Sequence, residues 1–478
     1  MTNKWVAAVM GCVLMVSCGG NRAKTEAELS DFGVYVDSLD SALQGKWFTR
    51  MGVSPDADEM LAYLREALPK NGLDTSAFFV PQIAEDLKTV HLLAFDSLGI
   101  SINEVLRRLD VNLQKAFVDY TTGQRYGFMR PDKVLNRMDE KVGGTGYAQL
   151  FDYEIKTPDF EEAKKQMASD DRITYLKESE PSNRTYQILQ QQLASSTDIA
   201  ERRKLAINLE RSRWQIKQPE EKGRQIVVNI AAQRLWAVGG DSALSMKICC
   251  GAVPTKTPLL CSAISYMQVN PEWVIPFNII KTDVANHGGD VAYFSRNNYW
   301  ILDRKTNDTL NAKNVSSEKL KSGSVRVVQK SGKGNSLGRI VFRFPNNFSV
   351  YLHDTNNRGA FQRERRTLSH GCVRVEKPFE LACFLLPEAD DWMIDRLRLS
   401  MDIKPETERG QKYLEEHPDA PSPLKLMTYQ EVEPKVPVYI IYYTAYPNPE
   451  TGIVELWPDI YKFDEVIAKE MGSFLLKK

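Results

Sequence analysis

The feature that most constrains the fold is a change of hydrophobic periodicity near residue 220. From about residue 30 to residue 215, apolar residues recur every three or four positions, as in amphipathic helices. From about Arg224 onwards, short apolar and β-branched runs alternate with Gly, Pro and Asn. The pattern predicts an α+β protein in which a helical domain precedes a strand-rich domain.

The first half has the sequence properties of a helical scaffold. It contains one histidine, His91, and no cysteine after Cys18. A surface for binding a partner is the alternative interpretation, but packing of the helices on their own apolar stripes is the simpler one. Helices are predicted over residues 58–68, 82–98, 102–120 and 185–214, the first of them ending before Asn71-Gly72.

The second half is organised around short strands. A polar segment at 281–336, rich in Asn, Lys, Ser and Gly, is too long for a simple connector and predicts a mobile lid or a small inserted subdomain. A helix is expected near 378–386. Strands are predicted at 225–230, 235–238, 246–253, 325–328, 339–344, 348–353 and 436–445.

The overall composition excludes several classes of protein. The chain has 478 residues, and its 62 Lys+Arg balance its 62 Asp+Glu. A net charge of zero gives no electrostatic reason to expect a nucleic-acid partner. Seven cysteines in a chain of this length are too few for a disulfide framework, so each must be interpreted in its own setting.

The N-terminus resembles an export signal. Residues 1–17 contain one Lys and a short apolar run that is too short to span a bilayer. The following Ser-Cys-Gly resembles a bacterial lipoprotein cleavage site, at which Cys18 would become the lipidated first residue. We therefore expect an exported, periplasmic protein that is anchored to a membrane by lipid. A plain secretory signal or a short membrane anchor is the alternative.

The most informative segment for chemistry is Tyr351-Leu-His353 followed by Ser369-His-Gly-Cys-Val-Arg374. Cysteine is a nucleophile as its thiolate, and a neighbouring imidazole can take the thiol proton and later return it to a leaving amine. Gly371 permits close approach of the backbone, and neighbouring amides can hold a developing oxyanion. Arg374 adds a fixed positive charge that suits a substrate with carboxylates. The residue types thus predict acyl transfer with Cys372 as nucleophile.

A zinc site is the other chemistry that these residue types permit. His353, His370 and Cys372 would be its ligands, but their spacing matches none of the common zinc patterns. We therefore expect no metal and no cofactor.

The motif resembles the active-site signature of the L,D-transpeptidases, the cysteine enzymes that cross-link peptidoglycan. Further stretches resemble the large multidomain branch with a helical scaffold, namely 270–276, 337–339, 344–347 and 374–378. The resemblance implies a scaffold at 30–215 and a catalytic domain at 224–400 with a capping segment at 281–336. Residues 401–478 would complete the fold.

The resemblance also implies residue roles. Cys372 is the nucleophile and His353 the proton donor and acceptor, and the backbone carbonyl of Asp354 orients His353. Gly371, Cys372 and Tyr351 would form the oxyanion site. The remaining implied substrate contacts involve Arg374, Trp273 and His370. A structural role is the equal alternative for Arg374, and His370 would shape the loop rather than titrate in the reaction.

The function that the resemblance implies is formation of 3→3 cross-links between stem peptides. A tetrapeptide donor would form a thioester with release of D-alanine, and the amine of a diamino acid would accept the acyl group. Carbapenem β-lactams would be inhibitors. An L,D-carboxypeptidase or a hydrolase of cross-links or wall-linked protein, using the same residues, stays open, as does a non-catalytic wall-binding lipoprotein.

The other cysteines have simpler interpretations. Cys12 would be removed with the signal. Cys249 and Cys250 are adjacent, so at most one of them could easily reach Cys261, and unpaired packing thiols are favoured over a disulfide. Cys383 is also interpreted as packing.

Overall fold

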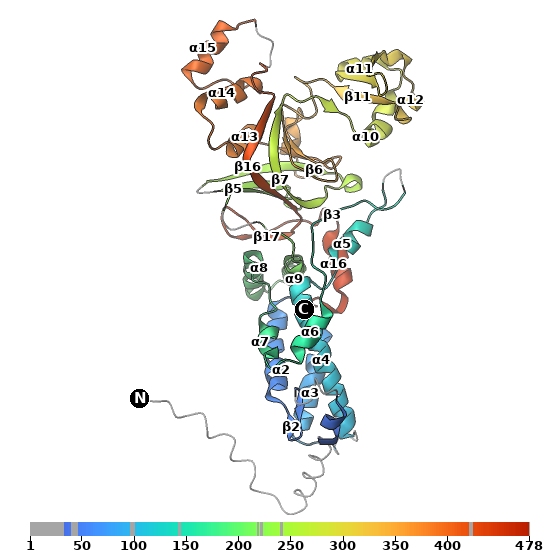
Figure 1. Cartoon of the computed structure of the whole chain (residues 1–478), viewed down its shortest axis with the longest axis vertical. Helices are drawn as coiled ribbons and strands as arrows, with labels where there is room; N and C mark the ends of the chain where they lie inside the picture. Colours follow the sequence, from blue (N-terminus) through green and yellow to red (C-terminus); the bar gives the residue numbers. More distant parts are fainter. Residues whose placement is uncertain are drawn as a thin grey trace, which may run out of the picture. The chain divides into compact units, whose positions relative to one another are not determined.

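The structure is a computed structural model, and it divides into two compact units that we describe separately (Figure 1). Unit 1 comprises 1–129, 156–215 and 465–478, and unit 2 comprises 130–155 and 216–464. The residues that the structure describes are 33–39, 46–95, 101–141, 145–217, 219, 223–239, 242–419 and 424–477. The predicted signal, Cys12 and Cys18 lie outside these residues.

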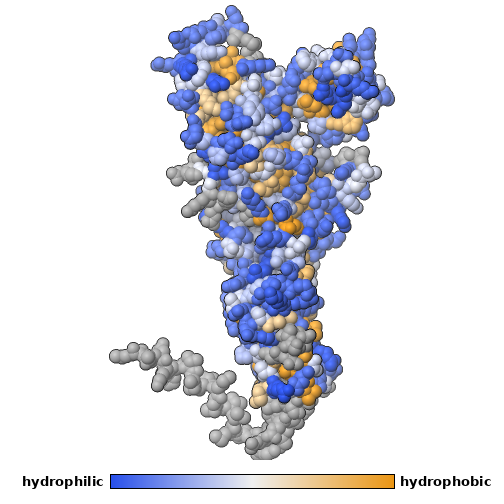
Figure 2. All heavy atoms as spheres, in the orientation of Figure 1, coloured by the Kyte–Doolittle hydropathy of each residue, from blue (hydrophilic) through white to orange (hydrophobic). Residues whose placement is uncertain are grey.

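Unit 1 is helical, as the periodicity predicts. In the view of Figure 2, hydrophilic side chains predominate on its exterior. Its apolar stripes are buried; in α4, for example, Leu106, Leu109 and Leu113 are fully enclosed. The helices of eight or more residues wholly inside this unit are α2 (Pro55–Lys70), α3 (Val80–His91), α4 (Ile102–Tyr126), α6 (Phe160–Met167), α8 (Arg184–Ser195) and α9 (Ile199–Arg213), and the short α7 (Arg172–Lys177) lies between α6 and α8.

The single helix predicted over 185–214 was wrong, because the chain forms α8 and α9 with a break between them. Ser196 leaves the helical conformation, and the carboxylate of Asp198 accepts a hydrogen bond from the Glu201 N–H at 2.7 Å. Asp198 is thus the N-cap of a new helix. The helix predicted over 82–98 also ends early, at His91.

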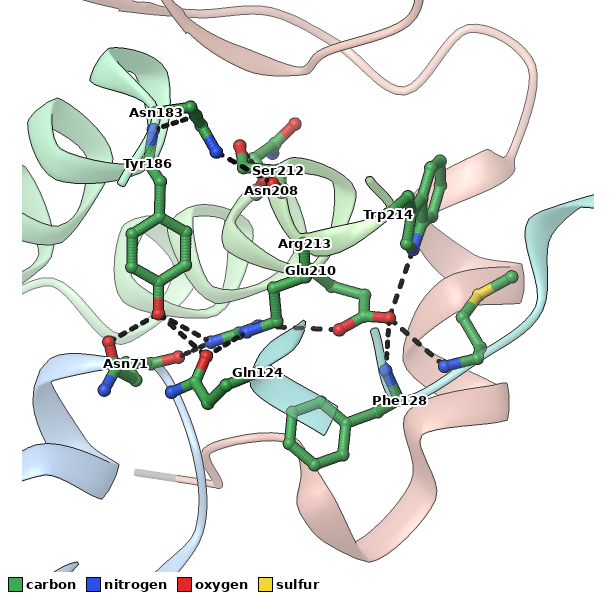
Figure 3. A network of polar contacts seen from close by, with 11 residues as sticks. Asn71, Gln124, Phe128, Asn183, Tyr186, Asn208, Glu210, Ser212, Arg213 and Trp214 are labelled. Atoms are coloured by element: carbon green, nitrogen blue, oxygen red, sulfur yellow. Dashed lines mark hydrogen bonds and ion pairs between the residues drawn. The ribbon is translucent and has the colours of Figure 1, made fainter. Parts of the chain in front are cut away.

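A buried polar network connects four of these helices (Figure 3). The Arg213 guanidinium donates to the Gln124 side chain at 2.8 Å and also to the Asn71 carbonyl. The Glu210 carboxylate accepts from the Phe128 N–H at 2.7 Å, so it satisfies a backbone donor where the chain leaves α4. Both charged side chains are fully buried, and their nitrogen and oxygen lie 3.5 Å apart. The network fixes α9 against its neighbours.

Unit 2 is built on a sheet that closes on itself. Its strands run in the order β12-β13-β15-β6-β5-β4-β16-β7-β3, and β12 also pairs with β7. Antiparallel pairs predominate, but β13 and β15 are parallel, as are β4 and β16. The strands are β3 (Phe151–Asp152), β4 (Gln225–Asn229), β5 (Arg234–Gly239), β6 (Ser242–Gly251), β7 (Leu259–Val269), β12 (Ile340–Arg343), β13 (Leu352–His353), β15 (Val373–Val375) and β16 (Tyr429–Ile441), and β14 (Thr367–Ser369) pairs with β6.

The boundaries of the two units differ from the sequence expectation at two places. Residues 130–155, expected in the scaffold, group with unit 2 because β3 pairs with β7 there. The chain end at 465–478 groups with unit 1, where Leu475 forms a β-bridge with Leu73. The late strand predicted over 436–445 is confirmed up to Ile441, where β16 ends, and β16 lies between β4 and β7.

The polar segment after Lys281 belongs to a small folded subdomain inserted in unit 2. Its own four-stranded sheet has the order β10-β9-β11-β8, and its own core includes Ile280, Phe294 and Leu320. Of the two predicted alternatives, the inserted subdomain is therefore the one observed. Its elements are β8 (Trp273–Val274), α10 (Phe277–Thr282), α11 (Val291–Arg296), β9 (Tyr299–Asp303), β10 (Thr309–Leu310), α12 (Ser317–Lys321) and β11 (Val325–Gln329).

The strand predicted over 348–353 was wrong in length, because β13 contains two residues. Before it, the Asn346 side chain accepts from the backbone N–H groups of Phe348 and Val350 at 3.0 and 3.1 Å. These local hydrogen bonds take the place of the hydrogen bonds that a strand would make with a neighbouring strand, and the segment forms a turn. Ser349 in this turn has a φ of 55°.

The C-terminal part of unit 2 adds helices and a hairpin. The predicted helix near 378–386 is confirmed as α13 (Pro378–Leu385). No helix in the described part of the chain is long and apolar enough to cross a membrane. The further elements of unit 2 are α14 (Asp391–Ser400), α15 (Glu408–Glu416), β17 (Ala445–Pro447) and β18 (Val454–Leu456). The helix α16 (Phe463–Met471) begins at the end of unit 2, and from residue 465 on it belongs to unit 1.

Candidate active site

A pocket of about 280 Å³ in unit 2 brings most of the predicted site residues together. One wall comes from the main sheet and the loop before β15, and the other comes from the inserted subdomain through Trp273, Pro276 and α10. The predicted residues that line it are Trp273, Tyr351, His353, His370, Cys372 and Arg374.

Strand register explains why residues distant in sequence meet here. Leu352 pairs with Val373, and His353 pairs with Arg374, in the parallel β13–β15 pair. Side chains alternate between the two faces of a sheet, so Tyr351, His353, Cys372 and Arg374 share one face. The His353 and Cys372 positions are diagonal neighbours across two strands, which is within reach of long side chains.

Cys372 immediately precedes β15, and its thiol is partly exposed to the pocket. Its Sγ donates to the Ser349 carbonyl at 3.8 Å. Burial raises the pKa of this thiol, while hydrogen bonds from Tyr351 and the positive charges of Arg343 and Arg374 act in the opposite direction. A base is therefore needed to form the thiolate near neutral pH.

His353 is buried and has a defined orientation. Its Nδ1–H donates to the Asp354 carbonyl at 2.5 Å, which leaves Nε2 as the basic nitrogen. Burial, with Arg374 adding to it, lowers the pKa of this imidazole to about 3. The side chain is thus neutral at physiological pH and able to accept a proton.

Tyr351 connects the thiol to the inserted subdomain. Its hydroxyl interacts with the side chains of Trp273 and Cys372, and burial raises its pKa well above the usual value. The Arg343 guanidinium stacks on its ring at 4.3 Å from the centroid. The phenol is therefore a neutral hydrogen-bond donor held beside Sγ.

The loop before Cys372 is fixed by side chains that sequence reasoning missed. Ser369 Oγ donates to the Cys372 carbonyl at 2.5 Å and accepts from the Gly371 N–H at 3.1 Å. The Thr257 hydroxyl donates to the Gly371 carbonyl at 2.8 Å, and Tyr461 in turn accepts from the Thr257 N–H at 3.2 Å. Thr257 and Tyr461 carry no local sequence signal, because they reach the loop through the fold.

Gly371 has a φ of 116°, which glycine adopts without strain. Because its N–H already has an acceptor in Ser369 Oγ, an oxyanion would have to displace that partner. The Cys372 N–H and the Tyr351 hydroxyl are the other donors at the nucleophile.

Arg374 and His370 occupy different environments in the pocket. The Arg374 Nε is buried and has no hydrogen-bond acceptor among the residues that the structure describes. His370 is exposed, and its Nε2 lies 3.5 Å from the Asp283 carboxylate of the inserted subdomain. His370 thus contacts the subdomain at the pocket rim rather than the thiol.

The remaining described cysteines have no disulfide partners. Cys249, Cys250, Cys261 and Cys383 are free thiols, as favoured from the sequence, and the first two are fully buried. Burial raises the pKa of Cys250 to about 12, so this thiol is protonated at neutral pH. Cys372 is the one among the described cysteines that lines the pocket.

A helical unit, a closed strand-rich unit and a cysteine–histidine pocket define an α+β protein with an enzyme-like site. Comparison with known protein families identifies the class of the protein more closely. Residues 223–394 match the L,D-transpeptidase catalytic domain, and residues 41–193 match the scaffold domain that accompanies it. The chain thus contains an L,D-transpeptidase catalytic domain and a scaffold domain, which confirms the predicted resemblance and fold class.

A curated relative supports the same assignment. Over 256 residues the chain is 32% identical to a protein of Haemophilus influenzae named "Putative L,D-transpeptidase". The aligned stretch covers 53% of this chain and 47% of the relative, so the chain spans about half the length of that protein.

Proposed function

We propose that this protein is a peptidoglycan L,D-transpeptidase that joins stem peptides by 3→3 cross-links through a thioester on Cys372. The observation that carries the proposal is the placement of the Cys372 thiol, the basic His353 and the Tyr351 hydroxyl around one pocket. The family match supports the reaction class.

The first step is acylation of the enzyme. Cys372 Sγ attacks the carbonyl of the third residue of a tetrapeptide stem, and His353 Nε2 accepts the thiol proton. The tetrahedral oxyanion takes hydrogen bonds from the Cys372 N–H and the Tyr351 hydroxyl, with Gly371 shaping the loop. Collapse breaks the peptide bond, and D-alanine leaves with the proton returned by His353.

The second step transfers the acyl group. The side-chain amine of a diamino acid on a neighbouring stem attacks the thioester carbonyl and gives a proton to His353. The new amide forms, the C–S bond breaks, and the thiol regains its proton. With water in place of the amine, the same site would release a tripeptide, so the acceptor determines whether the product is a cross-link.

Substrate contacts follow from the pocket walls. Arg374 lines the pocket, its Nε has no acceptor among the described residues, and its guanidinium suits a carboxylate of the stem peptide. Trp273 forms the opposite wall. His370 would contact substrate at the rim, beside the inserted subdomain that caps the pocket.

We also propose export to the periplasm and lipid attachment at Cys18. The support is the signal-like segment at 1–17 and the Ser-Cys-Gly that follows. Metabolic labelling with a fatty acid in the native host would label the wild type but not Cys18→Ala. Equal labelling of both would contradict the anchor.

A carbapenem tests the nucleophile. We expect intact mass spectrometry to show one covalent adduct on the wild type and none on Cys372→Ala. Cys250→Ala is the matched control, because this buried thiol is outside the pocket, and it should form the adduct normally. An adduct that persists in Cys372→Ala would contradict the proposal.

A further inference from the structure

We infer that the side chain of Asp354, held by Arg358 and accommodated by Gly338, positions His353 for proton transfer. The Asp354 carbonyl accepts from the His353 Nδ1–H, and the hydrogen bonds of the carboxylate fix the residue that carries this carbonyl. The inference deepens the proposed function and rests on it for the role of His353.

Every polar group of Asp354 has a partner. Its N–H donates to the Ile340 carbonyl at 3.0 Å, which continues the pairing with β12. Its carboxylate accepts from the Arg339 N–H at 2.8 Å and from the Arg358 guanidinium at 3.0 Å. The Asp354 side chain is 10% exposed, whereas that of Arg358 is 54% exposed. These bonds fix the backbone N–H and the side chain of Asp354, and therefore the Cα from which the carbonyl that accepts from His353 extends.

Gly338 makes the close approach of the carboxylate feasible. It has a φ of 64°, and a Cβ at this position would lie 2.3 Å from the Asp354 Oδ2. Larger residues would displace the carboxylate from the Arg339 N–H. The turn is itself anchored, because the Gly338 N–H donates to the carbonyl of the buried Asn335 at 3.0 Å.

Arg358 also connects the histidine strand to the cysteine strand. While one nitrogen donates to Asp354 just after β13, another donates to the Glu376 carbonyl just after β15, at 2.5 Å. A guanidinium presents its donors in a rigid fork, so the two strand ends are held at a fixed separation. His353 lies in β13 and Cys372 immediately precedes β15, so their separation is constrained in this way.

Two functional consequences follow. The fixed carbonyl selects the imidazole tautomer with the proton on Nδ1, which leaves Nε2 free to take the Cys372 proton. The hydrogen bond to the Asp354 carbonyl also favours the imidazolium that forms when the proton moves. The arrangement parallels the acid that orients the histidine in hydrolase triads, with a backbone carbonyl as the direct partner.

The test measures alkylation of Cys372 by iodoacetamide in the full-length protein between pH 5 and 9, counted by peptide mass spectrometry. At pH 7, Asp354→Ala should slow alkylation roughly 10–100-fold, the range for loss of a group that orients a functional histidine. Its rate should rise with pH as for an unassisted thiol, as in His353→Ala. Arg358→Ala should give a smaller loss, and Arg358→Lys should restore part of it.

A matched control comes from the same loop. Arg365 is an exposed arginine whose side chain hydrogen-bonds to Thr367, and Arg365→Ala should stay within about twofold of the wild type. A wild-type rate and pH profile in folded Asp354→Ala, with His353→Ala slow, would overturn the inference. If Asp354→Ala does not fold, an unchanged pH profile in Arg358→Ala would overturn it.

Alkylation by iodoacetamide needs no wall peptide, so the measured rate does not depend on which acceptor the proposed reaction uses. Alkylation of His353→Ala at the wild-type rate would instead contradict the proton transfer in the proposed function, and would do so separately.

Discussion

Tyr351 and Cys372 lie side by side where two parallel strands begin, and the Tyr351 carbonyl accepts from the N–H of the residue after Cys372 at 3.1 Å. The backbone pairing thus places the Tyr351 side chain next to the Cys372 thiol. It also places His353 diagonally across from Cys372 on the same face.

The low pKa of His353 predicts the pH dependence of acylation. Burial, with Arg374 contributing, lowers this pKa from 6.5 to about 3. The imidazole is the base in its neutral form, so its function is lost when the pH falls through the folded-state pKa. We expect the acid limb of Cys372 acylation by a carbapenem to lie well below pH 6.5.

Replacing Arg374 by Gln should move that limb to higher pH, because the imidazolium loses a repelling charge. The measurement is the acylation rate between about pH 2 and 8, with circular dichroism to verify the fold at each pH. A limb centred near pH 6.5 in the wild type, unmoved by the substitution, would contradict the account.

Arg343 is a second cation beside the thiol, and sequence reasoning missed it. It stacks on Tyr351 and favours the Cys372 thiolate. Arg343→Gln should therefore raise the thiol pKa and lower the alkylation rate at pH 7 by about three- to tenfold, the effect of about 0.5–1 pKa unit. Arg409→Gln is matched, since Arg409 stacks on Trp392 at the same 4.3 Å. Equal rates for the two variants would refute this role.

Thr257 supports the nucleophile loop through its hydroxyl. Thr257→Val keeps the shape but removes the bonds to the Gly371 carbonyl and from the Gly251 N–H. Each lost bond leaves a buried group without its partner, at a cost of about 1–3 kcal/mol. We expect slower carbapenem acylation of Cys372 and a lower melting temperature. A variant with a lower melting temperature but the wild-type acylation rate would show that the hydroxyl supports the fold alone.

Glu210 in unit 1 gives a prediction about stability. Glu210→Ala leaves Arg213 without its buried counterion and the Phe128 N–H without its acceptor. Loss of one partner of a buried pair typically costs about 3–5 kcal/mol. Thermal unfolding should show a large drop for this variant, and a change within about 0.5 kcal/mol for Glu161→Ala, whose ion pair is exposed. Similar melting temperatures for the two would contradict the network's role.

Local patterns predicted much of the fold because they act over neighbouring residues. Apolar spacing located the helices α2 and α4, and alternating runs located strands such as β4 and β5. The break at Ser196 was missed because the apolar period continues across it, and competition from the Asp198 cap decides the outcome. The short β13 was missed because Asn346 takes the backbone bonds that a longer strand would use.

The residues of the site could be predicted from the sequence only where they belong to a recognisable motif. Cys372, His353 and Tyr351 lie in one short signature, whereas Thr257 and Tyr461 reach the loop from distant segments. The pairing of β13 with β12 and β15 brings Arg343 to the site. Arg343 was missed because strand order cannot be predicted from short-range sequence patterns. The position of the Asp354 carboxylate depends on Gly338, because a Cβ at position 338 would lie too close to that carboxylate. This closeness is visible only in the structure.

The most direct test is incubation of the purified protein with disaccharide tetrapeptide muropeptides, followed by mass spectrometry of the products. The account predicts 3→3 cross-linked dimers with an equal amount of released D-alanine for the wild type, and neither product for Cys372→Ala. Folded wild-type protein that gives neither product, or dimers that persist in Cys372→Ala, would contradict it.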